Sequence, residues 1–250
     1  MIPVETYAEA IKRIMEKGFD GVEIHVLNRE FQIRKEFYED GFAERMKEVM
    51  SRCGVKAFSV GAHMDYTDSE KFDMVKKAIP IAKALGAGFL MISGPDRKKD
   101  QPFEPQWERM IKATRELCKV AEQNGMLLAM EHEGHFVVNN TDMVLKAFDE
   151  IGSPVMCVNA DIGHIFLWDA DPMETIGEIG EYIVHCHLEN MKRGVHNHLV
   201  PDDPEGDMDL PEYIRKLRSV GFDGPAALDV YQYDYEAIAE ESLRYLRGIL

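Results

Sequence analysis

Short apolar runs alternate with amphipathic helical segments along the whole chain, and this alternation constrains the fold more than any other feature. Seven runs are predicted strands, at residues 22–26, 57–60, 89–92, 127–130, 155–158, 183–184 and 226–228. Predicted helices occupy residues 4–17, 36–53, 69–85, 105–124, 141–150, 172–178 and 210–220. Strands that alternate with helices form a parallel sheet covered by helices. Because 250 residues is the usual size of one (β/α)8 barrel, we expect a single α/β domain spanning residues 1–250.

The start of the chain does not fit a complete barrel. An eighth strand would have to precede the first helix, but only Met1-Ile2-Pro3 is available there. The first strand is therefore missing or atypical. An open seam between the first and last strands would expose sheet edges, which proteins rarely leave unpaired. We expect this seam to be closed imperfectly or covered by a partner chain, either a second copy or another subunit.

The composition excludes several classes of partner. The formal net charge is −16, and the longest basic run is Arg97-Lys98-Lys99, so nucleic acid and anionic membranes are disfavoured. No apolar stretch approaches the ~20 residues of a membrane helix, and no signal peptide is evident. The four cysteines show no CxxC spacing and predict buried thiols in a reducing compartment. The expected location is the cytoplasm.

Acidic and histidine side chains follow four of the predicted strands directly. The clusters are Glu131-His132-Glu133, Asp161-Ile162-Gly163-His164, His185-Cys186-His187 and Asp229. Because the carboxyl ends of parallel strands meet at one end of a barrel, these groups should converge on one spot. An oxygen-rich set with an imidazole suits Mn²⁺, Mg²⁺ or Co²⁺, with Zn²⁺ also accommodated. The chain has no G-x-G-x-x-G, P-loop or G-x-S-x-G motif, so dinucleotide, nucleotide and serine-hydrolase functions lack support.

Each cluster also has a purely structural interpretation. Asp161 could cap the next helix, leaving His164 at the surface. His185 and His187 share one face of their strand, since side chains alternate with period two, and could be neutral core histidines. Glu131 is harder to explain structurally, because a buried carboxylate without a partner is costly. Asp229 supports the same argument on the last strand.

The order of these clusters resembles the xylose-isomerase-like TIM barrels, a superfamily of sugar isomerases and epimerases. In that family a Glu ends one strand, an Asp-x-x-His the next, a His-x-His segment the next, and a carboxylate the last. The resemblance implies one divalent metal ion, most simply Mn²⁺, held by Glu131, Asp161, His187 and Asp229. The resemblance also implies that His164 binds substrate and not the metal. The segment from His198 to Asp209 resembles a loop of the family, which is lengthened here by acidic residues.

Two positions depart from the family pattern. Asp229 replaces the usual Glu and is one methylene shorter. The ketose 3-epimerases of the family carry a further Glu where this chain has Val137, whereas Arg193 matches an arginine that contacts substrate in those enzymes. The missing Glu weakens the prediction of a free-ketose epimerase.

The predicted function is metal-dependent sugar isomerisation or epimerisation through a metal-stabilised enediolate. Glu131 and Asp229 are the candidate base and acid. The candidate substrate-binding residues are His164, Arg193, His198, Glu23 and His63. Two alternatives stay open: a lyase or dehydratase acting on keto-sugars, inososes or 3-keto-glycosides, and an inactive accessory subunit that keeps only the barrel. We expect His187 to bind the metal and His185 to support the site from one pleat deeper.

Overall fold

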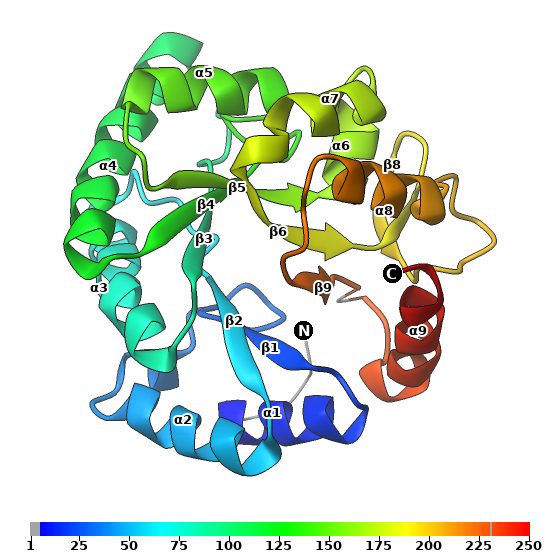
Figure 1. Ribbon diagram of the computed structural model, residues 1–250. Coiled ribbons are helices and arrows are strands. Elements are labelled where there is room, and N and C mark those ends of the chain that lie inside the picture. Colours follow the sequence, from blue (N-terminus) through cyan, green and yellow to red (C-terminus); the bar gives the residue numbers. More distant parts are fainter. Residues whose placement is uncertain (1–5, 231) are drawn as a thin grey trace.

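The computed structural model describes residues 6–230 and 232–250, which form a nearly closed barrel of parallel strands surrounded by helices (Figure 1). Its seven parallel strands are β1 (Gly21–His25), β2 (Lys56–Gly61), β3 (Phe89–Ser93), β4 (Leu127–Glu131), β5 (Met156–Asp161), β6 (Ile183–Leu188) and β9 (Ala226–Leu228). Each strand pairs with the next in this order. The architecture is therefore that of a TIM barrel with one strand fewer than eight, as the sequence predicted.

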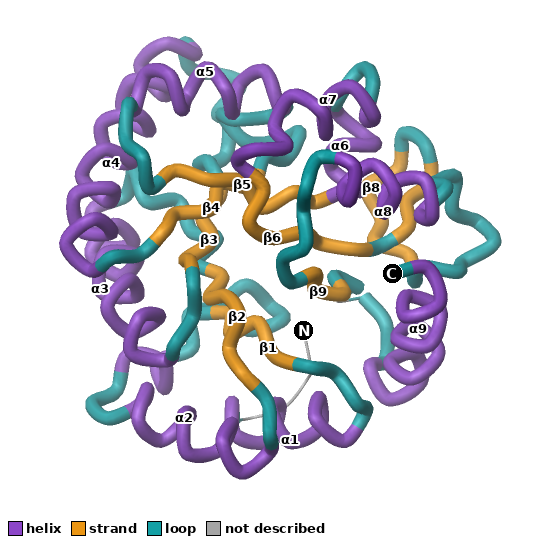
Figure 2. Tube along the Cα trace, viewed as in Figure 1, coloured by secondary structure: helices purple, strands orange, loops and turns teal. Residues whose placement is uncertain are grey.

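Helices cover the outside of the barrel in chain order (Figure 2). They are α1 (Tyr7–Glu16), α2 (Phe42–Cys53), α3 (Ser69–Leu85), α4 (Phe103–Asn124), α5 (Thr141–Ile151), α6 (Ile162–Trp168), α7 (Pro172–Ile179), α8 (Leu210–Ser219) and α9 (Tyr235–Ile249). Short 3-10 helices occupy Lys35–Tyr38 and Gly180–Tyr182. A small antiparallel hairpin, β7 (Asn190–Lys192) and β8 (Val195–Leu199), follows β6. None of the helices within the described ranges is long and apolar enough to cross a membrane.

One predicted helix was wrong. Residues 36–53 do not form a continuous helix, because Gly41 adopts a left-handed conformation with φ of 73°. A 3-10 turn ends at Tyr38, and α2 begins only at Phe42. Glycine tolerates positive φ at little cost, so it ends one helical segment and allows the next to start in a new direction.

The seam of the barrel lies between β1 and β9, which stand at the two ends of the sheet order within the described residues. Helices α1 and α9 bridge it on the outside. The Tyr235 hydroxyl donates to the Arg13 carbonyl at 3.1 Å, and Lys17 pairs with Glu236 and Glu240 at 3.2 and 3.0 Å. The seam is thus closed imperfectly, by helix contacts in place of strand pairing. The candidate first strand at residues 1–3 and the predicted helix start at residue 4 lie outside the described residues.

The strand pattern explains why polar groups occupy one end of the barrel. Phe89, Met91, Ala129 and Cys157 form a small apolar cluster separate from the larger core that contains Leu90, Ile92, Leu128 and Met130. Side chains alternate along a strand, so the inward series on β4 continues from Ala129 to Glu131. On β5 the same series runs from Cys157 through Asn159 to Asp161. Polar groups therefore replace apolar ones toward the carboxyl ends of the strands, where β/α barrels place their chemistry.

Candidate metal centre

Glu131, Asp161 and His187 meet at the carboxyl end of the barrel. The parallel register pairs Asp161 directly with His187, and Glu131 ends the adjacent strand β4. From His187 Nδ1, the nearest carboxylate oxygens of Glu131 and Asp161 lie at 3.3 and 3.5 Å. One ligand atom from each of the three residues lies within 4.8 Å of the others, and all three are buried. Ligand atoms that share one ion at ~2.1 Å lie roughly 3.0–3.5 Å apart, so the group has the right size.

Asp229 approaches this group from the side of β9. Its backbone N–H donates to the Leu188 carbonyl at 3.2 Å, which holds it beside the end of β6. The Asp229 Oδ2 atom lies 3.9 Å from His187 Nδ1, slightly farther than the other two carboxylates. Asp229 also falls into an overlapping group with Asp161, Glu189 and His198. The four residues predicted as metal ligands are thus brought together, with Asp229 at the edge of the group.

Two atoms of the group are buried without a hydrogen-bonding partner among the described residues, namely Asp161 Oδ2 and His187 Nδ1. An unsatisfied buried polar atom costs about 1–3 kcal/mol, so two such atoms facing each other need an explanation. A cation between them would satisfy both. The donor set, three carboxylates and one imidazole, fits a divalent ion that prefers oxygen.

The two carboxylate oxygens of Asp161 have different roles, one in the local fold and one in the site. Its Oδ1 accepts the His164 N–H at 2.7 Å and so caps the start of α6, which leaves Oδ2 for the site. Gly163 is required by a close approach, because a Cβ there would lie 2.3 Å from Glu189 Oε1 and 2.5 Å from Met191 Cε. The structural interpretation of Asp161 as a helix cap and the interpretation as a ligand are therefore compatible.

Glu23 orients the His187 ring. The Nε2–H of His187 donates to Glu23 Oε2 at 3.3 Å, and the Ser59 hydroxyl donates to the same oxygen at 2.9 Å. This arrangement points His187 Nδ1 at the carboxylates. Burial acts to lower the pKa of His187, but the Glu23 and Glu131 carboxylates outweigh it and hold that pKa well above its usual range. Glu23 therefore accepts a hydrogen bond from His187 and also lines the cavity.

His185 supports the site through Asn159. Its Nδ1–H donates to Asn159 Oδ1 at 2.8 Å, and Asn159 Nδ2 donates in turn to Glu131 Oε2. Burial lowers the pKa of His185 to about 4, against the opposing effect of Glu23, so the ring is neutral at ordinary pH. The two histidines of β6 therefore differ in charge: His187 is surrounded by carboxylates, and His185 is fixed by a neutral amide.

The carboxylates differ in protonation as well. Burial holds the pKa of Glu131 well above its usual range, and the neighbouring charges of Asp161 and Asp229 add to the effect. For Asp229, burial is outweighed by the charge of His198, which lowers the pKa of the carboxyl to about 2. Two carboxyl groups whose surroundings push their pKa values apart are suited to give and to take a proton.

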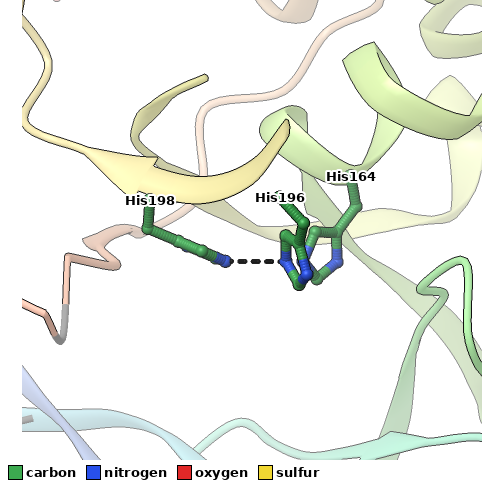
Figure 3. Close-up of side chains that lie close together, drawn as sticks. All are labelled: His164, His196 and His198. Carbon is green, nitrogen blue, oxygen red and sulfur yellow. Dashed lines mark hydrogen bonds between the residues drawn. The ribbon is translucent and has the colours of Figure 1, made fainter. Parts of the chain in front are cut away.

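Three histidines, His164, His196 and His198, lie close together and form a second candidate group (Figure 3). His164, on α6, donates from Nδ1 to the His132 carbonyl at 2.9 Å, and its buried Nε2 has no hydrogen-bonding partner within the described part of the chain. His196 and His198, on β8, approach each other through their Nε2 atoms at 3.1 Å. A group of three imidazoles is a donor set that Zn²⁺ accepts, in contrast to the oxygen-rich group around His187.

His198 also holds Asp229. Its Nδ1 lies 2.9 Å from the Asp229 carbonyl and 3.2 Å from Asp229 Oδ2. Burial opposes the charge on His198, but Asp229 outweighs it and raises the pKa of the imidazole to about 10. His198 is therefore a cation that fixes the position of the Asp229 carboxylate.

Among the cavity residues, His196 was not singled out from the sequence, and Glu133 was named there only as part of the cluster after the predicted strand at residues 127–130. The Glu133 Oε1 atom lies 2.8 Å from His135 Nδ1 and 3.3 Å from His196 Nδ1. Burial raises the pKa of Glu133 to about 8, with a further contribution from Asp161. For His196, the signal that could have found it is the period of two, which places it two residues before His198 on the same face of β8.

The remaining predicted substrate residues lie in different surroundings. His63 lines the cavity and stacks on His25, with ring centroids 5.1 Å apart. Arg193 lies farther out, where its guanidinium packs over the Phe166 ring at 3.8 Å and donates to the Phe166 carbonyl at 2.8 Å. Arg193 is not among the residues that line the cavity at the candidate metal centre.

The candidate centre opens into a large cavity. Its volume is about 1880 Å³, and it runs from the strand ends along the seam toward α1 and α9. Glu131, His164, His187, His198 and Asp229 all line it. A small molecule can therefore reach the carboxylates and imidazoles together.

Comparison with known proteins links this geometry to sugar enzymes. A family model described as the xylose isomerase-like TIM barrel matches residues 11–249. The fructoselysine 3-epimerase of Shigella flexneri is 29% identical over 188 residues, covering 72% of this chain and 67% of that protein. The L-ribulose-5-phosphate 3-epimerase UlaE of Salmonella typhi is 25% identical over 248 residues, covering 95% and 86%. The solved D-psicose 3-epimerase of Clostridium cellulolyticum H10 with D-tagatose shares the fold, with a TM-score of 0.78 at 18% identity over 99% of this chain and 94% of that one.

Proposed function

The chain belongs to the xylose isomerase-like TIM barrel family, and we propose that it is a divalent-metal-dependent sugar isomerase or epimerase. The observation that carries the proposal is a pair of buried atoms beside Glu131, Asp161 Oδ2 and His187 Nδ1, which have no hydrogen-bonding partner among the described residues. The two curated relatives, both 3-epimerases by name, support the same reaction class. Their low identity leaves the sugar open.

The proposed ligands are Glu131, Asp161, His187 and Asp229. A divalent ion bound there supplies polarisation of a carbonyl and stabilisation of negative charge on oxygen. Mn²⁺ is the proposed ion, because the donor set is rich in oxygen, and Mg²⁺, Co²⁺ and Zn²⁺ are the alternatives to test.

The proton is moved by carboxyl groups in this proposal. Glu131 ends β4 and Asp229 directly follows β9, and these two strands lie on either side of the His187 strand in the sheet order. One of them removes a proton from the carbon next to the substrate carbonyl, and the other returns a proton to the neighbouring position or to the opposite face. His198 keeps Asp229 ionised and in place, and His164 Nε2 offers a buried acceptor for a substrate hydroxyl.

A lyase is the second candidate, and one observation favours it. The family's ketose 3-epimerases carry a Glu at the position of Val137, but here that residue is 1% exposed and its N–H donates to the Pro95 carbonyl at 2.8 Å. No carboxylate can act from that position. The same proton removal would then expel a leaving group β to the carbonyl from a keto-sugar, an inosose or a 3-keto-glycoside.

Solvent deuterium exchange distinguishes these functions. Metal-stripped protein, reloaded with Mn²⁺, is incubated in D₂O with ketoses, inososes and 3-keto-glycosides, and His187→Ala protein serves as the matched control. Deuterium next to the carbonyl together with an epimer or isomer supports the proposal. An unsaturated elimination product supports the lyase. Absence of both exchange and metal binding in the unmodified protein would leave only an accessory role.

A further inference from the structure

The loop that follows β1 presents an aromatic ring at the opening of the cavity. Phe31 is 63% exposed, more than any other large hydrophobic side chain within the described ranges, and it lines the cavity. It is also the one non-glycine residue in the described part of the chain with positive φ, at 58°. A bulky residue in this conformation is unusual, because its Cβ crowds the following carbonyl.

Hydrogen bonds of the surrounding turn impose this conformation. Residues 27 and 33 form an antiparallel bridge, and the Asn28 N–H donates to the Gln32 carbonyl at 2.8 Å. The Phe31 N–H donates to the Asn28 carbonyl at 3.0 Å. The Asn28 Oδ1 atom accepts the N–H groups of Glu30 and Gln32, at 3.0 and 2.8 Å. The turn therefore fixes the backbone of Phe31 before any ligand arrives.

A glycine or asparagine would satisfy this turn with less strain. Phenylalanine at the same position also leaves most of a large apolar surface in water. Strain and exposure at one residue beside a candidate site point to a role in binding.

We propose that Phe31 is an aromatic platform that packs against the C–H face of the part of the sugar lying outside the metal centre. This inference rests on the proposed function. It names the substrate class more closely: a ketose of six or more carbons, or one that carries a substituent, in preference to a four-carbon ketose held entirely among the carboxylates. A ring on a fixed backbone has only two side-chain torsions to order on binding, which is why aromatic side chains suit this task.

The setting of Phe31 favours a sugar over a protein partner. Its sequence neighbours Glu30 and Gln32 are polar and exposed. Stable protein interfaces bury about 800 Å² on each partner, far more than one phenyl group offers. The cavity volume of about 1880 Å³ is above the ~300–1,000 Å³ of typical ligand pockets, so a sugar with a substituent can be accommodated.

The test compares Phe31→Ala and Phe31→Tyr across a series of ketoses of four, five and six carbons and substituted ketoses. We expect Phe31→Ala to raise KM about tenfold for the longer substrates with kcat unchanged, the pattern of lost uniform binding. KM for the four-carbon ketose should stay the same, and Phe31→Tyr should behave as the unmodified protein. Val195→Ala is the matched control, because Val195 is 47% exposed and is not among the cavity-lining residues.

Several outcomes would overturn the inference. Equal KM values for Phe31→Ala and the unmodified protein on every substrate would do so, and so would a KM change of the same size for the four-carbon ketose. A change in oligomeric state measured by light scattering, without a change in KM, would make the ring part of a protein interface. If the unmodified protein turns over no ketose, the proposed function fails. Calorimetric binding of the same sugars then decides about Phe31, whose role falls if affinity does not depend on residue 31.

Discussion

Replacing each histidine of β6 by alanine separates a metal ligand from its support. His187 and His185 lie two residues apart on the same buried strand, yet their surroundings differ. His187 faces the carboxylates of Glu23, Glu131 and Asp161 at 3.3 to 3.5 Å. His185 is neutral and bonds to Asn159. We expect His187→Ala to abolish metal binding and His185→Ala to leave it measurable.

The two replacements should also differ in their effect on folding. His187→Ala removes the positive partner of several buried carboxylates, and breaking a buried ion pair typically costs ~3–5 kcal/mol. His185→Ala leaves the Asn159 carbonyl oxygen without its donor, which costs ~1–3 kcal/mol. Added metal should recover stability only in the second variant, because an ion at 1,000 times its Kd contributes about 4 kcal/mol to a protein that binds it.

Urea unfolding with and without Mn²⁺ measures both effects, and titration calorimetry measures binding directly. The expected result is a metal-dependent shift of the unfolding midpoint for the unmodified protein and for His185→Ala, but none for His187→Ala. The reverse pattern would refute the assignment, because His185 would then be the ligand. Equal shifts in all three proteins would place the ion elsewhere, with the group of three histidines the first site to examine.

Three further predictions concern neighbouring residues. Asp229→Asn should retain some metal but lose turnover by ~10²–10⁴-fold in steady-state assays, whereas Asp229→Glu should be tolerated if the site shares the family's geometry. Metal affinity should rise with pH, because the raised pKa values of Glu131 and His187 mean that protons must leave both groups when the metal binds. Calorimetry in buffers of different ionisation heat should detect this proton release. A metal affinity that does not change with pH would contradict the prediction. Gly163→Ala should destabilise the protein by ~1–3 kcal/mol in urea, because its Cβ would meet Glu189 at 2.3 Å.

Much of the fold follows from the sequence, because strands and helices here have strong, regular patterns. The predicted helix at residues 69–85 and the predicted strand at residues 226–228 match α3 and β9 at both ends. The predictions missed α9 (Tyr235–Ile249), which does have such a pattern, and three elements that lack one. Helix α6 has seven residues and is mostly buried, so it shows no polar face, and the β7–β8 hairpin is built from polar residues such as Asn190, Lys192 and His196.

The candidate ligands could be predicted because each directly follows an apolar strand, but their relations to one another could not. The sequence left Asp161 as either a helix cap or a ligand, and the structure gives one oxygen to each task. It gave Glu23 only as a candidate substrate-binding residue, and the structure adds a contact between its side chain and His187. Such relations depend on the register between strands and on which rotamer fills a given space, and no local pattern records either.

Each candidate ligand is held by a hydrogen bond or ion pair from another residue, and this has a consequence for the chemistry. The supporting contacts are the His164 N–H on Asp161, Asn159 on Glu131, Glu23 on His187 and His198 on Asp229. Groups fixed in this way bind an ion without first losing rotamer freedom, and supporting residues of metal sites typically contribute ~10–100-fold to affinity. The sharpest case is Glu23, because it also determines which nitrogen of His187 faces the carboxylates. Loss of Glu23 would free the His187 ring to turn, so the centre depends as much on β1, the strand at the seam, as on the strands that carry the ligands.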